Sequence, residues 1–152
     1  MAKKIPVRAK TIIGWREWCR LEALNLPPIA AKIDTGAATS SLHAVRIKPF
    51  ERDGEEWVDF TIPKSPEHAA QLCEARVVTK RQIKSSNGRV EQRYVIETIM
   101  QLGPLLWKGQ MSLANRQSMA FPILIGRRAL RRGFLVNSGK RWLLGRPAPR
   151  RS

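Results

Sequence analysis

The residues with the clearest chemical potential lie between Lys32 and His43, in the stretch KIDTGAATSSLH. An apolar run leads into Asp34, and small glycine and hydroxyl residues follow at once. A carboxylate among apolar residues costs several kcal/mol unless it is paired, protonated or hydrogen-bonded, so a sequence that places one there usually uses it. Two interpretations are open: a catalytic acid or base, or a carboxylate that caps a turn through the amides of Thr35 and Gly36.

Metal and cofactor chemistry find little support in the residue types. His43 and His68 are the only histidines, no His-Glu-x-x-His or Cys-x-x-Cys motif occurs, and no glycine-rich loop of the phosphate-binding kind is present. The sequence therefore predicts no metal and no other cofactor; His43 with Asp34 and a third group is the zinc arrangement left open. Cys19 and Cys73 are expected to be reduced core thiols of a cytoplasmic protein, with a disulfide between them as the alternative.

Positive charge is the main compositional feature. The 152 residues carry a formal net charge of +16, and residues 76–152 hold 17 Lys or Arg against only Glu91 and Glu97. Such a field attracts polyanions, either phosphate backbones or acidic peptides, and basicity for solubility alone is the alternative. The length and the 43% apolar content predict one globular domain. No apolar run approaches the roughly 18 residues of a membrane span, so no membrane association is expected.

The elements that must position Asp34 are predicted to be mainly β strands, because most apolar segments are short and bounded by turn residues. Residues 11–21 form the expected first strand, two prolines interrupt the chain at 25–28, and 29–33 form the strand that delivers Asp34. The remaining expected elements are a hairpin with arms at 42–50 and 56–62, a long hairpin with arms at 72–83 and 90–100, strands at 105–113 and 121–125, a short helix at 127–132, and a closing hairpin from 134–136 and 141–144.

Two segments together resemble the retropepsin-like aspartic proteases. Ile33–Ala37 (IDTGA) is similar to their active-site signature, and Ile123–Arg127 (ILIGR) is similar to their second signature, an apolar pair and glycine that pack behind the active-site loop. The resemblance implies a mainly β fold: a closed retropepsin-like (acid protease) β-barrel with one short C-terminal helix. It places this domain at residues 11–145, after a basic N-terminal segment (1–10) and before a disordered basic tail (146–152).

The match extends to one bacterial family of these proteases, RimB-like and often labelled ATP-dependent zinc proteases. The segments that carry it are 14–18, 31–37, 39–44, 85–88, 135–136 and 143–145. Members often accompany RimK-type ligases, which add glutamates to a ribosomal small-subunit protein. The resemblance therefore implies an acidic peptide or polyglutamate-tailed ribosomal protein as substrate, and a RimK-type ligase as a possible partner. Ala38 departs from the arginine expected in the family, which leaves open a different substrate preference, and Asn137–Gly139 replaces an Asp-Pro-type turn.

Retropepsin-type chemistry needs two carboxylates about 3 Å apart that share one proton, because both cannot ionise at that distance. One carboxylate activates a water, and the other acts as an acid toward the carbonyl. The chain holds a single Asp-Thr-Gly, so the resemblance implies a homodimer with one Asp34 from each subunit. The residues it assigns are Asp34, Thr35 and Gly36 to catalysis, with Thr35 bracing the loop across the axis, and Ala37, Ala38 and Thr39 to substrate binding.

In such proteases a glycine-tipped hairpin, the flap, closes over the substrate. The hairpin that turns at 85–88 is the expected flap, and the one at 52–55 is the alternative. Cations on the long hairpin would bind a glutamate tail where they line the cleft, although strand alternation turns some of them to solvent. The candidate substrate-binding cations are Arg76, Lys80, Arg81, Lys84, Arg89 and Arg93. Arg127 is expected to form a structural ion pair, and Lys32 either lies near Asp34 or, if the strand bends, points to solvent.

Functions from different classes fit these features. The first is a homodimeric aspartic peptidase that trims acidic extensions. The second is a non-catalytic basic module that binds ribosome or RNA weakly through its basic C-terminal half, or that regulates a glutamate ligase by contact. Tryptophans can stack on bases, but Trp15, Trp18, Trp57 and Trp107 sit in apolar segments typical of a core. Replacing Asp34 by Asn separates the two classes.

Overall fold

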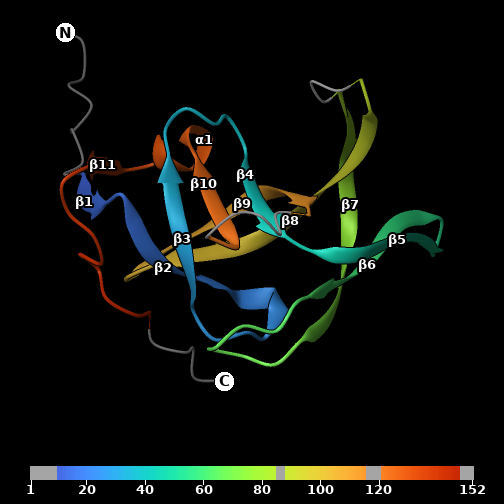
Figure 1. The fold of residues 1–152 in the computed structure, drawn as a ribbon, viewed down its shortest axis with the longest axis horizontal. Coiled ribbons are helices and arrows are strands. Elements are labelled where there is room, and N and C mark those ends of the chain that lie inside the picture. The colour runs from blue at the N-terminus through green and yellow to red at the C-terminus, as the bar shows by residue number, and fades with distance from the viewer. Residues whose placement is uncertain (1–9, 85–87, 116–120, 148–152) are drawn as a thin grey trace, which may run out of the picture.

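The protein is mainly β, as the sequence predicts. The computed structural model describes residues 10–84, 88–115 and 121–147 (Figure 1). Its strands are β1 (Thr11–Gly14), β2 (Arg16–Leu21), β3 (Ile29–Asp34), β4 (Ser40–His43), β5 (Val45–Arg52), β6 (Glu55–Ile62), β7 (Gln71–Lys84), β8 (Val90–Leu102), β9 (Leu105–Ala114), β10 (Ile123–Gly126) and β11 (Phe134–Asn137). Its helices are the 3-10 turn η1 (Glu22–Leu24) and α1 (Arg127–Leu130). None of the helices described is long and apolar enough to cross a membrane.

Nine strands form one sheet, and its order brings distant segments together. The order is β2-β3-β10-β4-β9-β8-β7-β6-β5. The first strand of this order, β2, also pairs with β8, so hydrogen bonds join two strands that are far apart in the order. The third strand of this order, β10, lies parallel to β3 and antiparallel to β4 (Figure 1). Asp34 and Gly126, which are 92 positions apart in the sequence, therefore meet at the end of β3.

The core consists of the inward faces of these strands. Ile33, Phe60, Met111 and Ile125 come from four different strands and all are buried. Burial on alternate positions is what a strand with one covered face produces, and removing this apolar surface from water is the main stabilising term. The strand expected at 29–33 and the arms of the long hairpin are confirmed, and the shorter hairpin is confirmed from Val45 onward.

Both cysteines are free and buried, which confirms the prediction of core thiols. Burial raises the pKa of Cys19 to about 12 and that of Cys73 to about 11, because an apolar surrounding disfavours the thiolate. Both side chains are therefore protonated at neutral pH, and neither is suited to act as a nucleophile.

Two expected strands are each divided. The segment 11–21 breaks at Trp15 into β1 and β2, and the segment 42–50 breaks at Ala44 into β4 and β5. The division at Trp15 has a clear cause: its N–H donates to Lys140 O, and its carbonyl accepts from Ile33 N, both at 2.8 Å. These hydrogen bonds to two separate segments separate β1 from β2, and β1 pairs with β11 instead.

The prediction of a closing hairpin from 134–136 and 141–144 is wrong. β11 pairs in parallel with β1 instead, and residues 141–144 form no strand. The carboxylate of Glu17, which is fully buried, accepts from Leu143 N at 3.0 Å and Leu144 N at 3.1 Å. A buried carboxylate needs such donors, and it takes the amides that a hairpin would have used.

The segment after residue 145 begins with ordered packing. The guanidinium of Arg146 lies 4.2 Å from the ring centroid of Trp18, which stacks on Trp142 at 4.6 Å. Pro147 is buried. The expected tail therefore starts with two packed residues; its remainder, 148–152, and most of the expected N-terminal segment 1–10 lie outside the described residues.

Candidate active site

Asp34 ends β3 at a half-buried position, where the pairing of the sheet also ends. Its Cα partner is Gly126, the last residue of β10. The amide of Gly36 donates to Asp34 Oδ1 at 2.9 Å, and the amide of Ala37 donates to Asp34 O at 3.2 Å. The carboxylate is thus oriented by the backbone of its own loop, as the turn-capping interpretation expects. Thr35 and Gly36 are exposed at the tip.

The strand β10 packs directly behind this loop. Its residues Ile123, Leu124 and Ile125 are buried, and Gly126 N donates to the buried Ser40 Oγ at 3.1 Å. A Cβ at Gly126 would lie within 3.0 Å of backbone atoms of the loop. The expected role of the second signature is therefore confirmed: this glycine lets the two segments approach.

Arg127 holds the same loop from the start of α1. Its N–H donates to Ala37 O at 2.8 Å, and its Nη1 donates to Gly36 O at 3.1 Å. The expected ion pair is not found among the described residues. Two carbonyl oxygens take the place of a carboxylate, because the loop turns its backbone acceptors toward α1. Arg127 is a positioning residue for the loop.

Lys32 faces solvent. Its side chain is exposed, and no ion pair joins it to Asp34 within the part of the chain that is described. Of the two expectations for Lys32, the one in which it faces solvent is correct.

A pocket of about 290 Å³ adjoins the loop, and five of the predicted substrate-binding residues line it. These residues are Ala37, Ala38, Thr39, Arg81 and Arg93. Arg81 and Arg93 are direct cross-strand partners on β7 and β8, and Arg81 Nη1 donates to Thr39 Oγ1 at 3.2 Å. Arg93 Nη2 also lies 4.0 Å from Glu91 Oε2, whereas Arg81 forms no ion pair within the described residues. Two cations opposite each other repel, and an anion near Arg81 offsets this repulsion, so the pocket is suited to a carboxylate.

Three further residues of the pocket were not predicted from the sequence. Ser41, Ser112 and Leu124 complete the lining. The sequence could have indicated Leu124 and Ser41, since each lies inside a segment that resembles a family motif. It could not have indicated Ser112, because only the parallel pairing of β4 with β9 places it opposite Ser41.

Two other predicted cations, Arg76 and Lys80, lie away from this pocket and contact acids. Arg76 lies 3.5 Å from Glu55, and Lys80 lies 3.0 Å from Glu56, both on β6. The register of β6 with β7 brings these opposite charges together, and neither side chain lines the pocket. Arg89 is exposed near the hairpin's end. The side chain of Lys84, like most of the turn at 85–88, lies outside the described residues.

No group of three or more His, Cys, Asp or Glu side chains that could hold a metal ion occurs among the described residues.

An Asp-Thr-Gly loop backed by a buried apolar strand and glycine defines the class of retropepsin-like proteins. The chain belongs to the RimB-like family, described as retropepsin-like aspartic endopeptidase RimB, which it matches over residues 12–147.

Three known proteins show how far this similarity reaches. A probable alpha-L-glutamate ligase of Shewanella halifaxensis is 45% identical over 138 residues, which cover 90% of this chain and 30% of the relative. One of Desulfotalea psychrophila is 41% identical over 139 residues, with the same coverages. The chain thus spans about a third of the length of these relatives. The crystal structure of protein Lpg0085 from Legionella pneumophila, of unknown function, has a TM-score of 0.76 and 30% identity, covering 88% of this chain and 97% of that one.

Proposed function

We propose that this chain is an aspartic peptidase that acts as a homodimer and shortens acidic, glutamate-rich extensions of a protein, a polyglutamate-tailed ribosomal protein being the expected substrate. The observation that carries the proposal is the Asp34 loop. It holds a half-buried carboxylate by the Gly36 amide and is braced from behind by Gly126 and Arg127. This arrangement fixes a carboxylate in one orientation, which acid–base catalysis requires.

A second copy of the loop supplies the missing half of the chemistry. The chain has one Asp-Thr-Gly, and Thr35 and Gly36 are exposed at its tip. Two such tips meeting on a two-fold axis bring two Asp34 carboxylates together, and like charges at that separation share one proton. The ionised carboxylate removes a proton from water as the water attacks the peptide carbonyl, and the protonated one donates to the carbonyl oxygen.

Glutamate as the substrate residue is supported by charge and by the relatives. Arg81 and Arg93 line the pocket beside the loop, and the hydroxyls of Thr39 and Ser41 add further polar groups. The curated relatives are named as glutamate ligases. A domain that removes glutamates is a fitting complement to an activity that adds them, and it makes a RimK-type ligase the expected partner.

The long hairpin of β7 and β8 is the proposed flap. The alternative at 52–55 is attached to the sheet: Arg52 binds Glu74 through two hydrogen bonds of 2.9 and 3.1 Å, which lower the pKa of the Glu74 carboxyl. Arg52 also lies 4.6 Å from the ring centroid of Trp57. In the same proposal, the ladder that returns from β8 to β2 is the closed barrel of the retropepsin-like domain, which spans residues 11–145.

The test is incubation of the protein with a peptide that ends in several glutamates, followed by mass spectrometry. We expect the wild type to shorten the tail and Asp34→Asn to lose about 10³-fold or more of the rate, because Asn cannot transfer the proton. A matched peptide that ends in glutamines is expected to remain intact. A wild type that shortens neither peptide across a range of pH would contradict the proposal, and polyanion binding that survives Asp34→Asn would then favour the non-catalytic module.

A further inference from the structure

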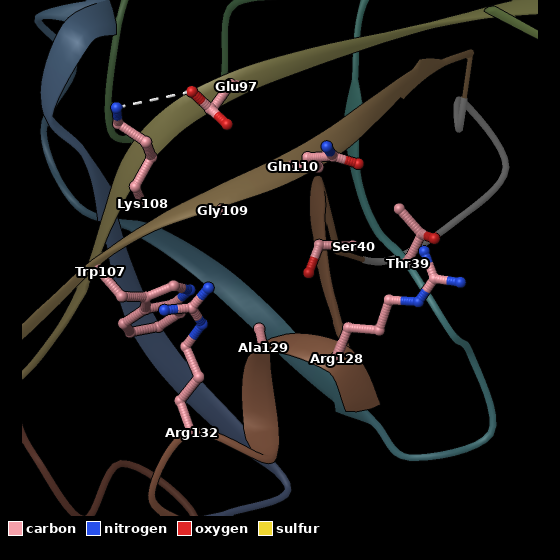
Figure 2. A pocket seen from close by; sticks show the side chains of 10 residues that line it. All are labelled: Thr39, Ser40, Glu97, Trp107, Lys108, Gly109, Gln110, Arg128, Ala129 and Arg132. Atoms are coloured by element: carbon pink, nitrogen blue, oxygen red, sulfur yellow. Dashed lines mark ion pairs between the residues drawn. The ribbon is translucent and has the colours of Figure 1, made fainter. Parts of the chain in front are cut away.

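A second pocket lies on the other side of Thr39. Its volume is about 310 Å³, and Thr39 lines both it and the pocket beside the Asp34 loop. Its wall comes from β9 and from α1 with the turn that follows (Figure 2). The side chains that matter here are Ser40, Trp107, Lys108, Gln110, Arg128 and Arg132.

The pocket is strongly basic. Arg128 and Arg132 are four residues apart, so they extend from one face of α1 and its following turn. Figure 2 shows Arg128 reaching toward Thr39 and Arg132 reaching toward the indole of Trp107. Neither arginine forms an ion pair within the described residues. The one acid in the lining, Glu97, is engaged by Lys108, whose Nζ lies 3.7 Å from its Oε1.

A buried donor in the pocket has no partner. Trp107 is only 9% exposed, and its indole Nε1 makes no hydrogen bond. A buried N–H without an acceptor is costly, and native proteins rarely leave one. Gly109 keeps the space beside it open, since a Cβ there would lie 3.1 Å from Trp107 Nε1. This donor, together with two arginines, calls for an acceptor of negative charge.

We propose that this pocket binds a glutamate carboxylate of the acidic peptide, as a second anion subsite outside the cleft that holds the cleaved bond. The inference rests on the proposed function for the identity of its ligand. Carboxylate oxygens accept from guanidinium and indole N–H groups alike. Residues two apart in an extended peptide are about 6.6 Å apart and share a face. One glutamate can therefore enter the pocket with Arg81 while another, farther along the tail, enters the pocket with Arg132.

The pocket selects for tail length under this proposal. A peptide too short to reach both sides of Thr39 gains the charge interactions of one pocket only. Ligands that span both pockets gain the second set without a second loss of translational freedom. Longer glutamate tails are thus bound more tightly than short ones.

The experiment measures binding of pentaglutamate by isothermal titration calorimetry to protein that carries Asp34→Asn, which prevents cleavage during the titration. Adding Arg132→Gln is expected to raise the Kd about tenfold, the usual effect of losing a charge-assisted hydrogen bond. Arg131→Gln is the matched control, because it removes an equal charge from the neighbouring exposed residue, which does not line the pocket. We expect it to change the Kd by less than about twofold. Trp107→Phe, which keeps an aromatic ring and removes the N–H, is expected to raise the Kd about threefold.

The outcomes separate this proposal from the peptidase proposal. If the wild type cleaves no peptide but pentaglutamate binding still depends on Arg132 and not on Arg131, the pocket stands and the peptidase proposal falls. If cleavage occurs but both arginine variants change the Kd equally, the pocket proposal falls, since only general charge is then involved. Displacement of pentaglutamate by a short oligouridylate with the same dependence on Arg132 and a lower Kd would assign the pocket to phosphate and overturn the proposal.

Discussion

At the scale of single residues, the shape of the Asp34 loop depends on Gly126. A Cβ at this position would lie 2.8 Å from Thr39 C, 2.9 Å from Ala37 O and 3.0 Å from Ala38 C. All three are backbone atoms, which cannot move aside as the end of a flexible side chain can. Residues Ala37 to Thr39, which are proposed to bind substrate, therefore hold their place because residue 126 has no side chain.

We predict that Gly126→Ala destabilises the protein by about 1–3 kcal/mol, the usual cost of inserting a carbon into a closely packed site. It should also reduce peptidase activity by more than the loss of folded protein accounts for, because the loop that carries Asp34 is displaced. Urea denaturation and peptide cleavage measure the two effects.

Gly139→Ala is the control for this substitution. Its Cβ would meet Asn137 Oδ1 at 3.5 Å, an ordinary contact, so a change within about 0.5 kcal/mol is expected. Equal stability of the two variants would show that the loop backbone moves to accommodate a Cβ at residue 126, contrary to the packing described above.

At the scale of elements, Glu17 joins three segments that the hydrogen-bond ladder leaves apart. Besides Leu143 N and Leu144 N, its carboxylate accepts from Gly14 N at 2.7 Å. These amides belong to β1 and to the chain after β11. A single buried side chain on β2 thus connects the two ends of the described chain to the main sheet.

We predict that Glu17→Gln lowers the free energy of unfolding by about 2–3 kcal/mol. The glutamine side chain has no negative charge to strengthen the hydrogen bonds, and its NH2 group faces backbone N–H groups that need an acceptor. Urea denaturation at unchanged m-value is the measurement. Glu67→Gln serves as the control, since Glu67 is exposed and bonds only locally to Ser65. If both substitutions have the same small effect, Glu17 does not connect these segments energetically.

At the scale of the whole molecule, one chain provides one Asp34 loop, and the proposed chemistry requires two. In the proposed function the dimer is part of the active site, and each subunit is then expected to lose its activity when its partner lacks the carboxylate.

We predict that mixing wild type with Asp34→Asn protein lowers the activity per wild-type subunit in proportion to the wild-type fraction. Random pairing makes the fraction of fully wild-type dimers equal to the square of that fraction. Cleavage of a glutamate-tailed peptide is followed after subunits have exchanged, at constant total protein. Activity per wild-type subunit that stays constant across the mixtures would mean that a single chain carries a complete site.

Local signals predicted the strand that delivers Asp34 and the arms of the long hairpin, and the family resemblance predicted the packing role of Gly126. They failed where distant segments compete for the same groups. Residues 141–144 follow a turn and are rich in apolar residues, but the amides of Leu143 and Leu144 bind Glu17 instead of a neighbouring strand. Arg76 and Lys80 have the charge of a substrate site, but the register of β6 with β7 pairs them with acids.

The sequence by itself determined the family, the loop that holds Asp34 and the mainly β character, because each depends on residues adjacent in the chain or on a period of two. Only the tertiary structure decided which cations gather around Thr39. Arg81 and Arg93 come from one hairpin, and Arg128 and Arg132 come from the region of α1, so their meeting depends on the pairing of β4 with β9 and β10. Hydrogen-bond register between distant strands is a collective outcome of packing, and no single segment of sequence encodes it.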